Sequence, residues 1–235
     1  MNKILVNNND SLIKVPDGSN IFIFDNSPNS LKVEIGLGCL VNYVAILDKD
    51  CERNIYVGNN SELNISSLYQ FSGQFKINNF IGREVILNSQ VLSYLKNDQN
   101  LQVEDNYIFT DELSSGKINI NSLADDSSVI NYSSDVVIKP VATHTETRID
   151  MKLHLLSPQA KGFMLPGLKI ATNQVKAGHG ASTSQLTLED LFYLSARGLN
   201  SDQAKKLIKE TVVRQFINSI SDEETKIIIS NLIKL

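Results

Sequence analysis

Short runs of β-branched and aromatic residues, separated by Asn, Asp, Ser and Gly, fill the chain from residue 31 to about residue 170. In Leu31–Ile35 apolar and charged side chains alternate, as they do along a strand with one buried face. Similar runs recur at residues 41–47, 54–57, 73–77, 85–87, 117–120 and 136–138. So many short strands predict a mainly β fold of the sandwich, barrel or solenoid kind.

The turns between these runs favour a solenoid among the three architectures. They are rich in Asn and Asp, and no two neighbouring runs are joined by the two-residue Asn-Gly type of link that marks a β-hairpin. Strands that do not fold back as hairpins can stack as successive parallel coils. The runs show no fixed period, so the sequence does not give the length of a coil.

After Ser184 the pattern changes to helical spacing. Thr187 can cap a helix over residues 188–197, with Glu189 and Asp190 in its first turn and Gly198 as its stop. A second helix is predicted from Asn200 or Ser201, and its apolar face would carry Ala204, Leu207, Ile208, Val212, Phe216, Ile217 and Ile220. We therefore expect a β core over residues 1–184 and a small helical domain over residues 185–235.

A third helix is expected near the C-terminus. Ser221 and Glu224 stand in the spacing of a capping box, and the apolar residues at 227–229 and 232–233 follow them. This segment should pack back on the helices before it.

Composition narrows the class of protein. The net charge of −4 and pI near 5.4 argue against a nucleic-acid-binding surface. No apolar stretch is long enough for a membrane span, and the first apolar run is too short for a secretion signal. Two cysteines make no disulfide framework. We expect a cytoplasmic protein with no nucleic-acid or membrane partner.

His179 is the candidate metal ligand. Glycine flanks it on both sides, so its imidazole would be open to a partner chain or an ion, and imidazole suits Fe, Zn and Cu. One ligand does not make a metal site. From the residues alone, the better interpretation of the segment at 176–183 is a glycine-rich turn that joins the β part to the helices.

The other residues that could carry chemistry favour structural roles. Cys39 and Cys51 lie far apart with no further thiol, so core packing is the better interpretation. Glu146 and Asp150 could serve as an acid/base pair, but Arg148 would share their strand face, which favours a solvated row of ion pairs. No phosphate-binding loop and no Gly-x-Ser-x-Gly elbow occur, so we expect no enzyme activity.

The last third of the chain carries four motifs in a fixed order. They are residues 153–160, LHLLSPQA, residues 165–170, LPGLKI, residues 179–183, HGAST, and residues 191–199, LFYLSARGL. The first two resemble the N-L-L-L-S-x-x-A and P-x-L-E-I motifs of the SufD/SufB family of iron–sulfur cluster assembly scaffolds. The last two resemble that family's H-G-A-T and L-F-Y-L-x-S-R-G-I motifs with matching intervals. By this comparison the chain is a short form that lacks the N-terminal helical region usual in the family.

The resemblance implies a right-handed parallel β-helix with a C-terminal helical domain. It implies pairing through the β-helix with a SufB-like subunit, or with itself as a homodimer, and docking of a SufC-type ATPase on residues 188–216. The docking residues at the closest motif would be Leu191, Phe192, Tyr193, Arg197 and Gly198.

The resemblance also implies how iron or a cluster would be held. His179 matches a histidine at the SufB–SufD interface, so no cofactor would be bound stably and a cluster or iron would be held there only in transit. Gly180 is typical of SufD, whereas SufB-type chains carry glutamate. Ala177 stands where the family often has cysteine, and no cysteine follows Cys51. Any cluster would therefore need thiols from a partner.

Two other functions stay open. The chain could be a β-solenoid interaction protein without a cluster role. It could also be a carbohydrate-active β-helix enzyme, which the absence of Trp weakens.

Overall fold

Parallel strands make up most of the protein. The computed structural model describes residues 2–233, except for the side chains of Leu188 and Leu191. Its strands are β1 (Asn2–Leu5), β2 (Leu12–Val15), β3 (Asn20–Asp25), β4 (Leu31–Ile35), β5 (Leu40–Leu47), β6 (Cys51–Val57), β7 (Glu62–Tyr69), β8 (Gly73–Ile81), β9 (Ile86–Leu95), β10 (Asn100–Phe109), β11 (Ser115–Ala124), β12 (Val129–Ile138), β13 (Glu146–Leu155), β14 (Lys161–Ile170) and β15 (Lys176–Gln185). The predicted mainly β fold is confirmed.

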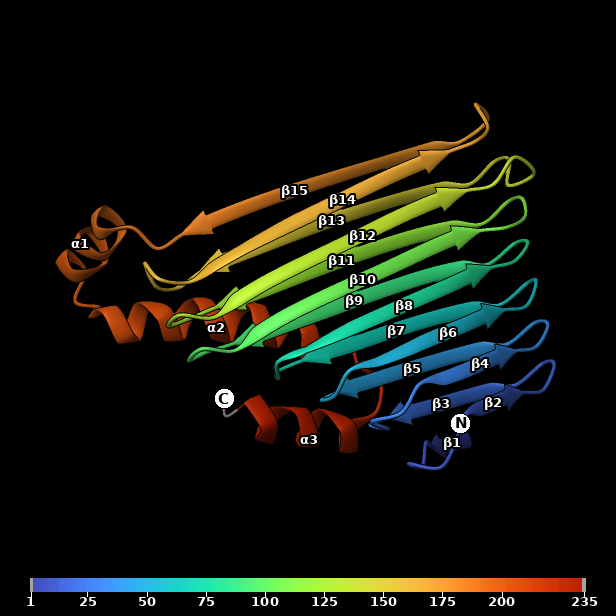
Figure 1. Cartoon of the computed structure of the whole chain (residues 1–235), viewed down its shortest axis with the longest axis horizontal. Coiled ribbons are helices and arrows are strands. Elements are labelled where there is room, and N and C mark those ends of the chain that lie inside the picture. Colours follow the sequence, from blue (N-terminus) through green and yellow to red (C-terminus); the bar gives the residue numbers. More distant parts are fainter. Residues whose placement is uncertain (1, 234–235) are drawn as a thin grey trace.

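The strands wind into a β-solenoid with two walls. Odd-numbered strands form one eight-stranded parallel sheet, here called sheet A, and even-numbered strands form a seven-stranded parallel sheet, sheet B. Each strand therefore pairs with the strand two places along the chain, and the coils stack from β1 at one end to β14 and β15 at the other (Figure 1). The preference for a solenoid over a sandwich or barrel is confirmed.

The coils lengthen along the chain. Hydrogen bonds from a backbone amide to a side chain of the neighbouring coil show this increase. The bonded residues are separated in the sequence by 20 positions at Asp17 and Leu37, by 24 at Asn59 and Arg83, and by 29 at Val85 and Ser114. A repeat that grows in this way has no fixed period. This explains why the sequence did not reveal the coil length.

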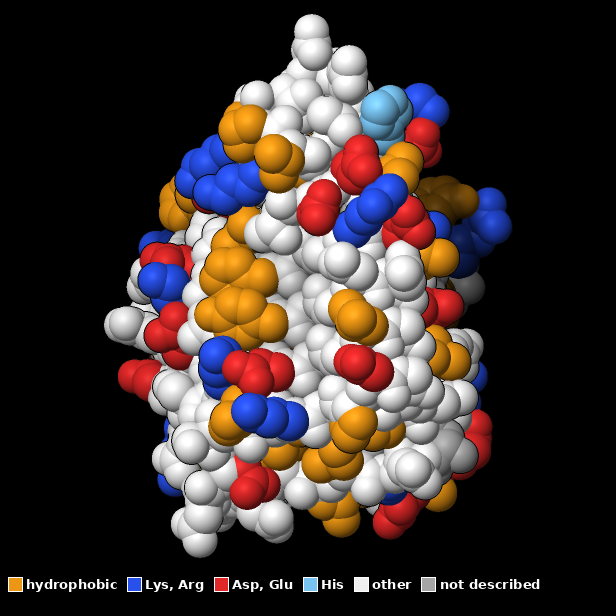
Figure 2. All heavy atoms as spheres, turned by 90° about the vertical axis from the view of Figure 1, so that its right-hand side faces the viewer, with side chains coloured by type: hydrophobic (Ala, Val, Ile, Leu, Met, Phe, Trp, Pro, Cys, Tyr) orange, Lys and Arg blue, Asp and Glu red, His pale blue; other side chains and the backbone are white. Residues whose placement is uncertain are grey.

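One column of turn residues has left-handed backbone. Their φ angles lie between 54° and 67° at Gly18, Gly38, Asn60, Glu84, Leu113 and His144, and the amide of each donates to a carbonyl of the next coil. Only the first two are glycine, although this conformation costs other residues about 1 kcal/mol each. The edge of the molecule formed by these turns carries charges of both signs, with hydrophobic side chains gathered between them (Figure 2).

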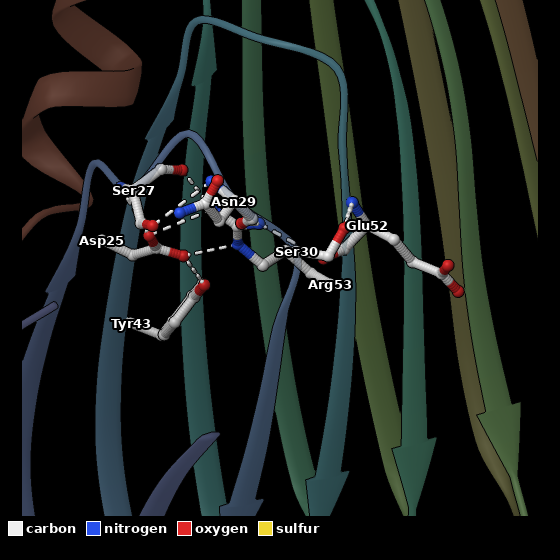
Figure 3. A network of polar contacts seen from close by, with 7 residues as sticks. All are labelled: Asp25, Ser27, Asn29, Ser30, Tyr43, Glu52 and Arg53. Atoms are coloured by element: carbon white, nitrogen blue, oxygen red, sulfur yellow. Dashed lines mark hydrogen bonds and ion pairs between the residues drawn. The ribbon is translucent and has the colours of Figure 1, made fainter. Parts of the chain in front are cut away.

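The core between the walls is apolar with two buried polar clusters. Residues 41, 43, 45 and 47 of β5 point inward, and alternate residues of each strand do the same. Cys39 and Cys51 are buried free thiols in this core, as predicted. One polar cluster joins Asp25 to Arg53 and Tyr43 (Figure 3), and the other surrounds Asp105.

Asp105 accepts hydrogen bonds from Tyr107 at 2.8 Å, from Tyr132 at 3.0 Å and from the Asn79 amide at 3.2 Å. Burial raises the pKa of this carboxyl from 3.8 to about 6, against the opposing effect of those three donors. Between about pH 4 and pH 6 the Asp105 carboxyl is therefore protonated in the folded protein, whereas the unfolded chain has already released this proton. The stability of the folded protein is expected to fall by about 3 kcal/mol as pH rises through that window.

Asp105→Asn is expected to remove this pH dependence. Urea unfolding at pH 4 and pH 8 would measure the free energy of unfolding of both proteins, and the wild type should lose about 2–3 kcal/mol relative to the variant. Asp98→Asn changes an exposed carboxylate and serves as the control. Parallel pH profiles for wild type and Asp105→Asn would contradict the assignment.

Three helices follow β15, and two of them cover sheet A from outside (Figure 1). They are α1 (Leu188–Ala196), α2 (Ser201–Asn218) and α3 (Glu223–Ile233). A second hydrophobic cluster joins outward-facing residues of sheet A, among them Val44, Leu68 and Leu92, to Val213 and Phe216 of α2. Lys3 also binds Asp222 and Glu224 of the α3 end at 3.3 and 2.8 Å.

The structure bears out most of the predicted helix signals and corrects three details. The caps at Thr187 and Asn200 and the left-handed stop at Gly198 are present. The α3 cap is Asp222, whose carboxylate accepts from the Thr225 amide, rather than Ser221. Leu207 is exposed, so it does not belong to the buried face of α2. Val213, which the spacing missed, does.

Two further differences concern the limits of the β part. Strands β1 to β3 precede residue 31, where the sequence pattern first became clear. The segment around His179 forms strand β15 rather than a glycine-rich turn. Its low strand propensity is overridden because β13 offers it a complete parallel ladder.

Candidate functional site

The terminal coil, defined as β14, β15 and the turns that flank them, is the most distinctive surface of the β part. Among the described strands, β14 pairs only with β12, and β15 only with β13. Each therefore has one unpaired edge of backbone N–H and C=O groups. No described coil covers the apolar core beyond β14 and β15, so Met164 and Leu168 are only partly buried against it.

The two free edges differ in their capacity to accept another strand. The Lys161 amide donates to the carbonyl of Ser128, just before β12, and the Ala171 amide donates to the carbonyl of Ile138, the last residue of β12. Amides point to alternate sides along a strand, so those of the even-numbered β14 residues point to the free edge. Pro166 occupies one of these positions and leaves a gap in that edge. Strand β15 contains no proline, so its edge is uninterrupted.

His179 lies on β15 and is exposed. Its register partner is Ile149 of β13, which is fully buried in the core, so the imidazole lies on the inner side of the terminal coil. Ala177 on the same side packs against that core. His179 therefore stands over the open end of the solenoid, where a chain that covers this end would meet it.

His179 has no companion ligand in the described part of the chain. Among residues 2–233 no group of three or more His, Cys, Asp or Glu side chains is placed to hold a metal ion. Cys39 and Cys51 lie in earlier coils of the core. The described residues thus supply one imidazole and an open surface.

Ion pairs line the outer face of sheet A along β13 and β15. Arg148 binds Asp150 through Nε and Nη2, both at 2.7 Å, and Lys176 binds Glu146. The predicted row of solvated ion pairs is confirmed. A Cβ atom at Gly180 would lie 2.8 Å from the Asp150 carboxylate, so a larger residue there would require this pair to shift.

The second candidate surface is the exposed part of α1. Phe192 and Tyr193 are 76% and 58% exposed, and the Arg197 guanidinium lies 5.2 Å from the centre of the Tyr193 ring. Leu191 lies in the same helix, but its side chain is outside the described part. The helix lies past the end of β15, away from the sheets (Figure 1), so this surface is separate from His179.

A groove of about 300 Å³ separates α1 from the solenoid. Tyr193, Leu194 and Ile208 line one side of it, and His154 and Ser184 line the other. Nδ1 of His154 lies 2.9 Å from the Ser184 hydroxyl, and burial together with the charge of Lys152 lowers the pKa of the histidine. Sequence reasoning missed this pair because its residues are 30 apart and meet only through the coil register.

The C-terminal end of the predicted ATPase-docking range, residues 188–216, is not exposed to a partner. Val212, Val213 and Phe216 are buried against sheet A, so the exposed surface is confined to α1 and the outer side of α2. Within the described helices, none is both long and apolar enough to cross a membrane.

Comparison with known proteins identifies the family. Residues 51–212 match the model of the SufBD core domain of SUF-system iron–sulfur cluster assembly. An iron–sulfur cluster assembly SufBD family protein of Mycobacterium leprae is 34% identical over 88 residues, which cover 37% of this chain and 22% of that protein. A SufBD family protein of Synechocystis is 32% identical over 89 residues, which cover 38% of this chain and 20% of the relative.

A third relative carries a more specific name. The iron–sulfur cluster assembly protein SufD of Plasmodium falciparum is 33% identical over 73 residues, which cover 31% of this chain and 5% of that protein. These matches span about a fifth or less of the relatives' own lengths. The family model matches more than half of this chain. The motifs identified in the sequence and the β-solenoid of the structure agree with that match. The chain therefore belongs to the SufBD family of SUF-system iron–sulfur cluster assembly proteins.

Proposed function

We propose that this chain is a non-enzymatic scaffold subunit of a SUF-type assembly complex. It pairs with a SufB-like subunit through the terminal coil and docks a SufC-type ATPase through α1. The observation that carries the proposal is the presence of two unpartnered surfaces, one at the end of the β-solenoid and one on a helix beyond it. A scaffold that joins two other proteins needs both.

The ATPase-docking role rests on the character of α1. Phe192 and Tyr193 together expose a large aromatic area that no other described element covers. Such residues, with an arginine beside them, are the side chains that most often anchor protein–protein contacts. Nucleotide chemistry would then belong to the partner, in agreement with the lack of a phosphate-binding loop in this chain.

The pairing role rests on the free edge of β15. An unbroken strand edge over an open apolar core is a surface that another strand can extend. Gly180 supports a SufD-like rather than a SufB-like position in the pair, because the glutamate of SufB-type chains would displace the Arg148–Asp150 pair.

His179 gives this interface its proposed chemistry. The cluster is cargo, and the chain offers it one imidazole nitrogen at the open end of the solenoid. Thiolate ligands would come from the SufB-like subunit, since both cysteines of this chain are buried in the core.

Affinity capture of the SufC-type ATPase of the same organism tests the docking role. Phe192→Ala and Arg197→Ala are each expected to weaken its retention by about tenfold or more, because each removes an exposed anchor. His179→Ala changes an exposed residue outside the helices and should retain the ATPase fully. If wild type retains no ATPase, or if neither α1 substitution changes retention, the docking role is wrong.

A further inference from the structure

A polar groove lies between sheet A and α2, outside both the terminal coil and α1. Its volume is about 370 Å³, which is within the range of small-molecule sites in proteins. Gln215 and Phe216 of α2 line one side of it. The sheet lines the other side with the side chains of Gln90, Asn119, Asn121, Asp150 and Lys152.

Strand register explains why a groove forms at this place. One outward-facing row of sheet A runs through Ile46, Leu68 and Leu92, and α2 covers this apolar part of the row. The same row continues in the next two coils as Asn121 and Lys152. These two residues give the helix no apolar surface to pack on, so a space with polar walls is left beside α2.

The amides in the groove differ from other outward-facing amides of sheet A. In the coils before it, Asn64 and Asn88 are joined by a hydrogen bond of 3.0 Å. Gln90, Asn119 and Asn121 are half-buried, yet none of them makes a hydrogen bond with another described residue. Each primary amide offers two donor hydrogens and one acceptor oxygen. The groove therefore presents donors and acceptors side by side that the described chain does not use.

The charges in the groove disfavour a strongly charged ligand. Among the described residues that line it, Asp150 and Lys152 are the ionic ones. Asp150 is also held by Arg148 through two contacts of 2.7 Å. An anion would meet the Asp150 carboxylate, and a cation would meet Lys152 and Arg148. Phe216 is only 5% exposed, so it offers little ring surface for a flat apolar ligand.

We infer that this groove binds a small neutral ligand with adjacent hydroxyl groups, either a mono- or disaccharide or the ribose of a nucleoside. Gln90, Asn119 and Asp150 stand in one row on neighbouring strands, about 4.8 Å apart, a spacing that one sugar ring can bridge. A hydroxyl donates and accepts, as a primary amide does, so the two groups match. Gly180 ends the row, and its lack of a side chain leaves that end of the groove open.

This inference goes beyond the proposed function and does not rest on it. It gives the chain a ligand that neither the docking role nor the pairing role requires. Loss of either role would leave the groove unchanged, and the test below uses the full chain without a partner.

Nuclear magnetic resonance of the ¹⁵N-labelled chain tests the inference, because the side-chain amides of Asn119 and Asn121 report directly on the groove. The probes are glucose, maltose and adenosine. At least one probe should shift these signals saturably, with a dissociation constant of about 1 mM or lower. Shifts with glucose or maltose identify a sugar ligand, and shifts with adenosine alone identify a nucleoside. In the second case 2′-deoxyadenosine, which lacks one of the adjacent hydroxyls, should bind about fivefold more weakly.

Substitutions distinguish the groove from weak binding elsewhere. Asn119→Ala and Gln90→Ala should each weaken binding of the same probe by about fivefold or more, the effect of losing one or two neutral hydrogen bonds. Asn131→Ala is the matched control, because it removes a half-buried amide from the outer face of sheet B, and it should change the affinity by less than about twofold. The backbone spectrum of each variant shows whether it keeps its fold.

Three results would overturn the inference. The first is the absence of saturable shifts at the groove amides with every probe at about 20 mM. The second is equal affinity in wild type, Asn119→Ala and Gln90→Ala. The third is binding of glucose 6-phosphate about tenfold or more tighter than glucose, which would mark the groove as an anion site.

Discussion

Arg53→Met is expected to lower the free energy of unfolding by about 3–5 kcal/mol, because it leaves a carboxylate without a counter-charge inside the solenoid. The side chains of Arg53 and Asp25 are 1% and 0% exposed. The guanidinium donates to Asp25 from Nε at 2.7 Å and from Nη2 at 3.2 Å, and to the carbonyls of Ser27 and Asn29 at 2.6 and 2.5 Å (Figure 3).

The pKa directions agree with this picture. Burial disfavours the charged form of Arg53, but its hydrogen bonds and the charge of Asp25 outweigh burial and raise its pKa. Burial and then Asp25 raise the pKa of Tyr43, whose hydroxyl donates to the same carboxylate. Arg53 therefore keeps its charge, and its contacts with Asp25, Ser27 and Asn29 fasten the loop after β3 to β6.

Urea unfolding at pH 7 measures the cost. Arg83→Met is the control, because Arg83 forms exposed ion pairs with Glu84 and Glu112 and should cost less than about 0.5 kcal/mol. Asp25→Asn combined with Arg53→Met should cost less than the sum of the single changes, since no unpaired charge remains. A cost below about 1 kcal/mol for Arg53→Met would show that the pair does not hold these coils together.

The same pair illustrates what the sequence could not reveal. Arg53 lies beside a predicted strand, and alternation with Ile55 places it on the inner side of β6. Its partner is 28 residues away, and only the coil length brings the two together. That length varies from coil to coil, so the mainly β class could be predicted while individual contacts between coils could not.

The candidate site was predictable to a similar extent. The local motifs led to His179, to Phe192 and to Arg197, and all three are exposed. The strand that carries His179 was missed, because glycine and serine dominate it and its stability comes from β13 rather than from its own residues. Its place over an open core follows from register, which no local pattern encodes.

Phe216→Ala is expected to destabilise the protein by about 3–5 kcal/mol, the usual cost of removing a buried aromatic ring. Phe216 is 5% exposed and belongs to the cluster that joins α2 to the outer face of sheet A. That face is apolar in the middle coils, where Ile46, Leu68 and Leu92 point outward under the helix. Without α2 these side chains would be exposed to water, so the helices and the sheets should unfold in one transition rather than as two domains.

Thermal unfolding followed by circular dichroism in the helical and strand regions measures both expectations. The two signals should change together in wild type, and Phe216→Ala should lower the midpoint of both. Phe192→Ala makes a matched control, since it removes the same ring from a position that is 76% exposed and should shift stability by no more than about 0.5 kcal/mol. If Phe216→Ala melts the helical signal alone and leaves the strand transition unchanged, residues 185–235 fold as a separate domain and the cluster on sheet A is not part of a common core.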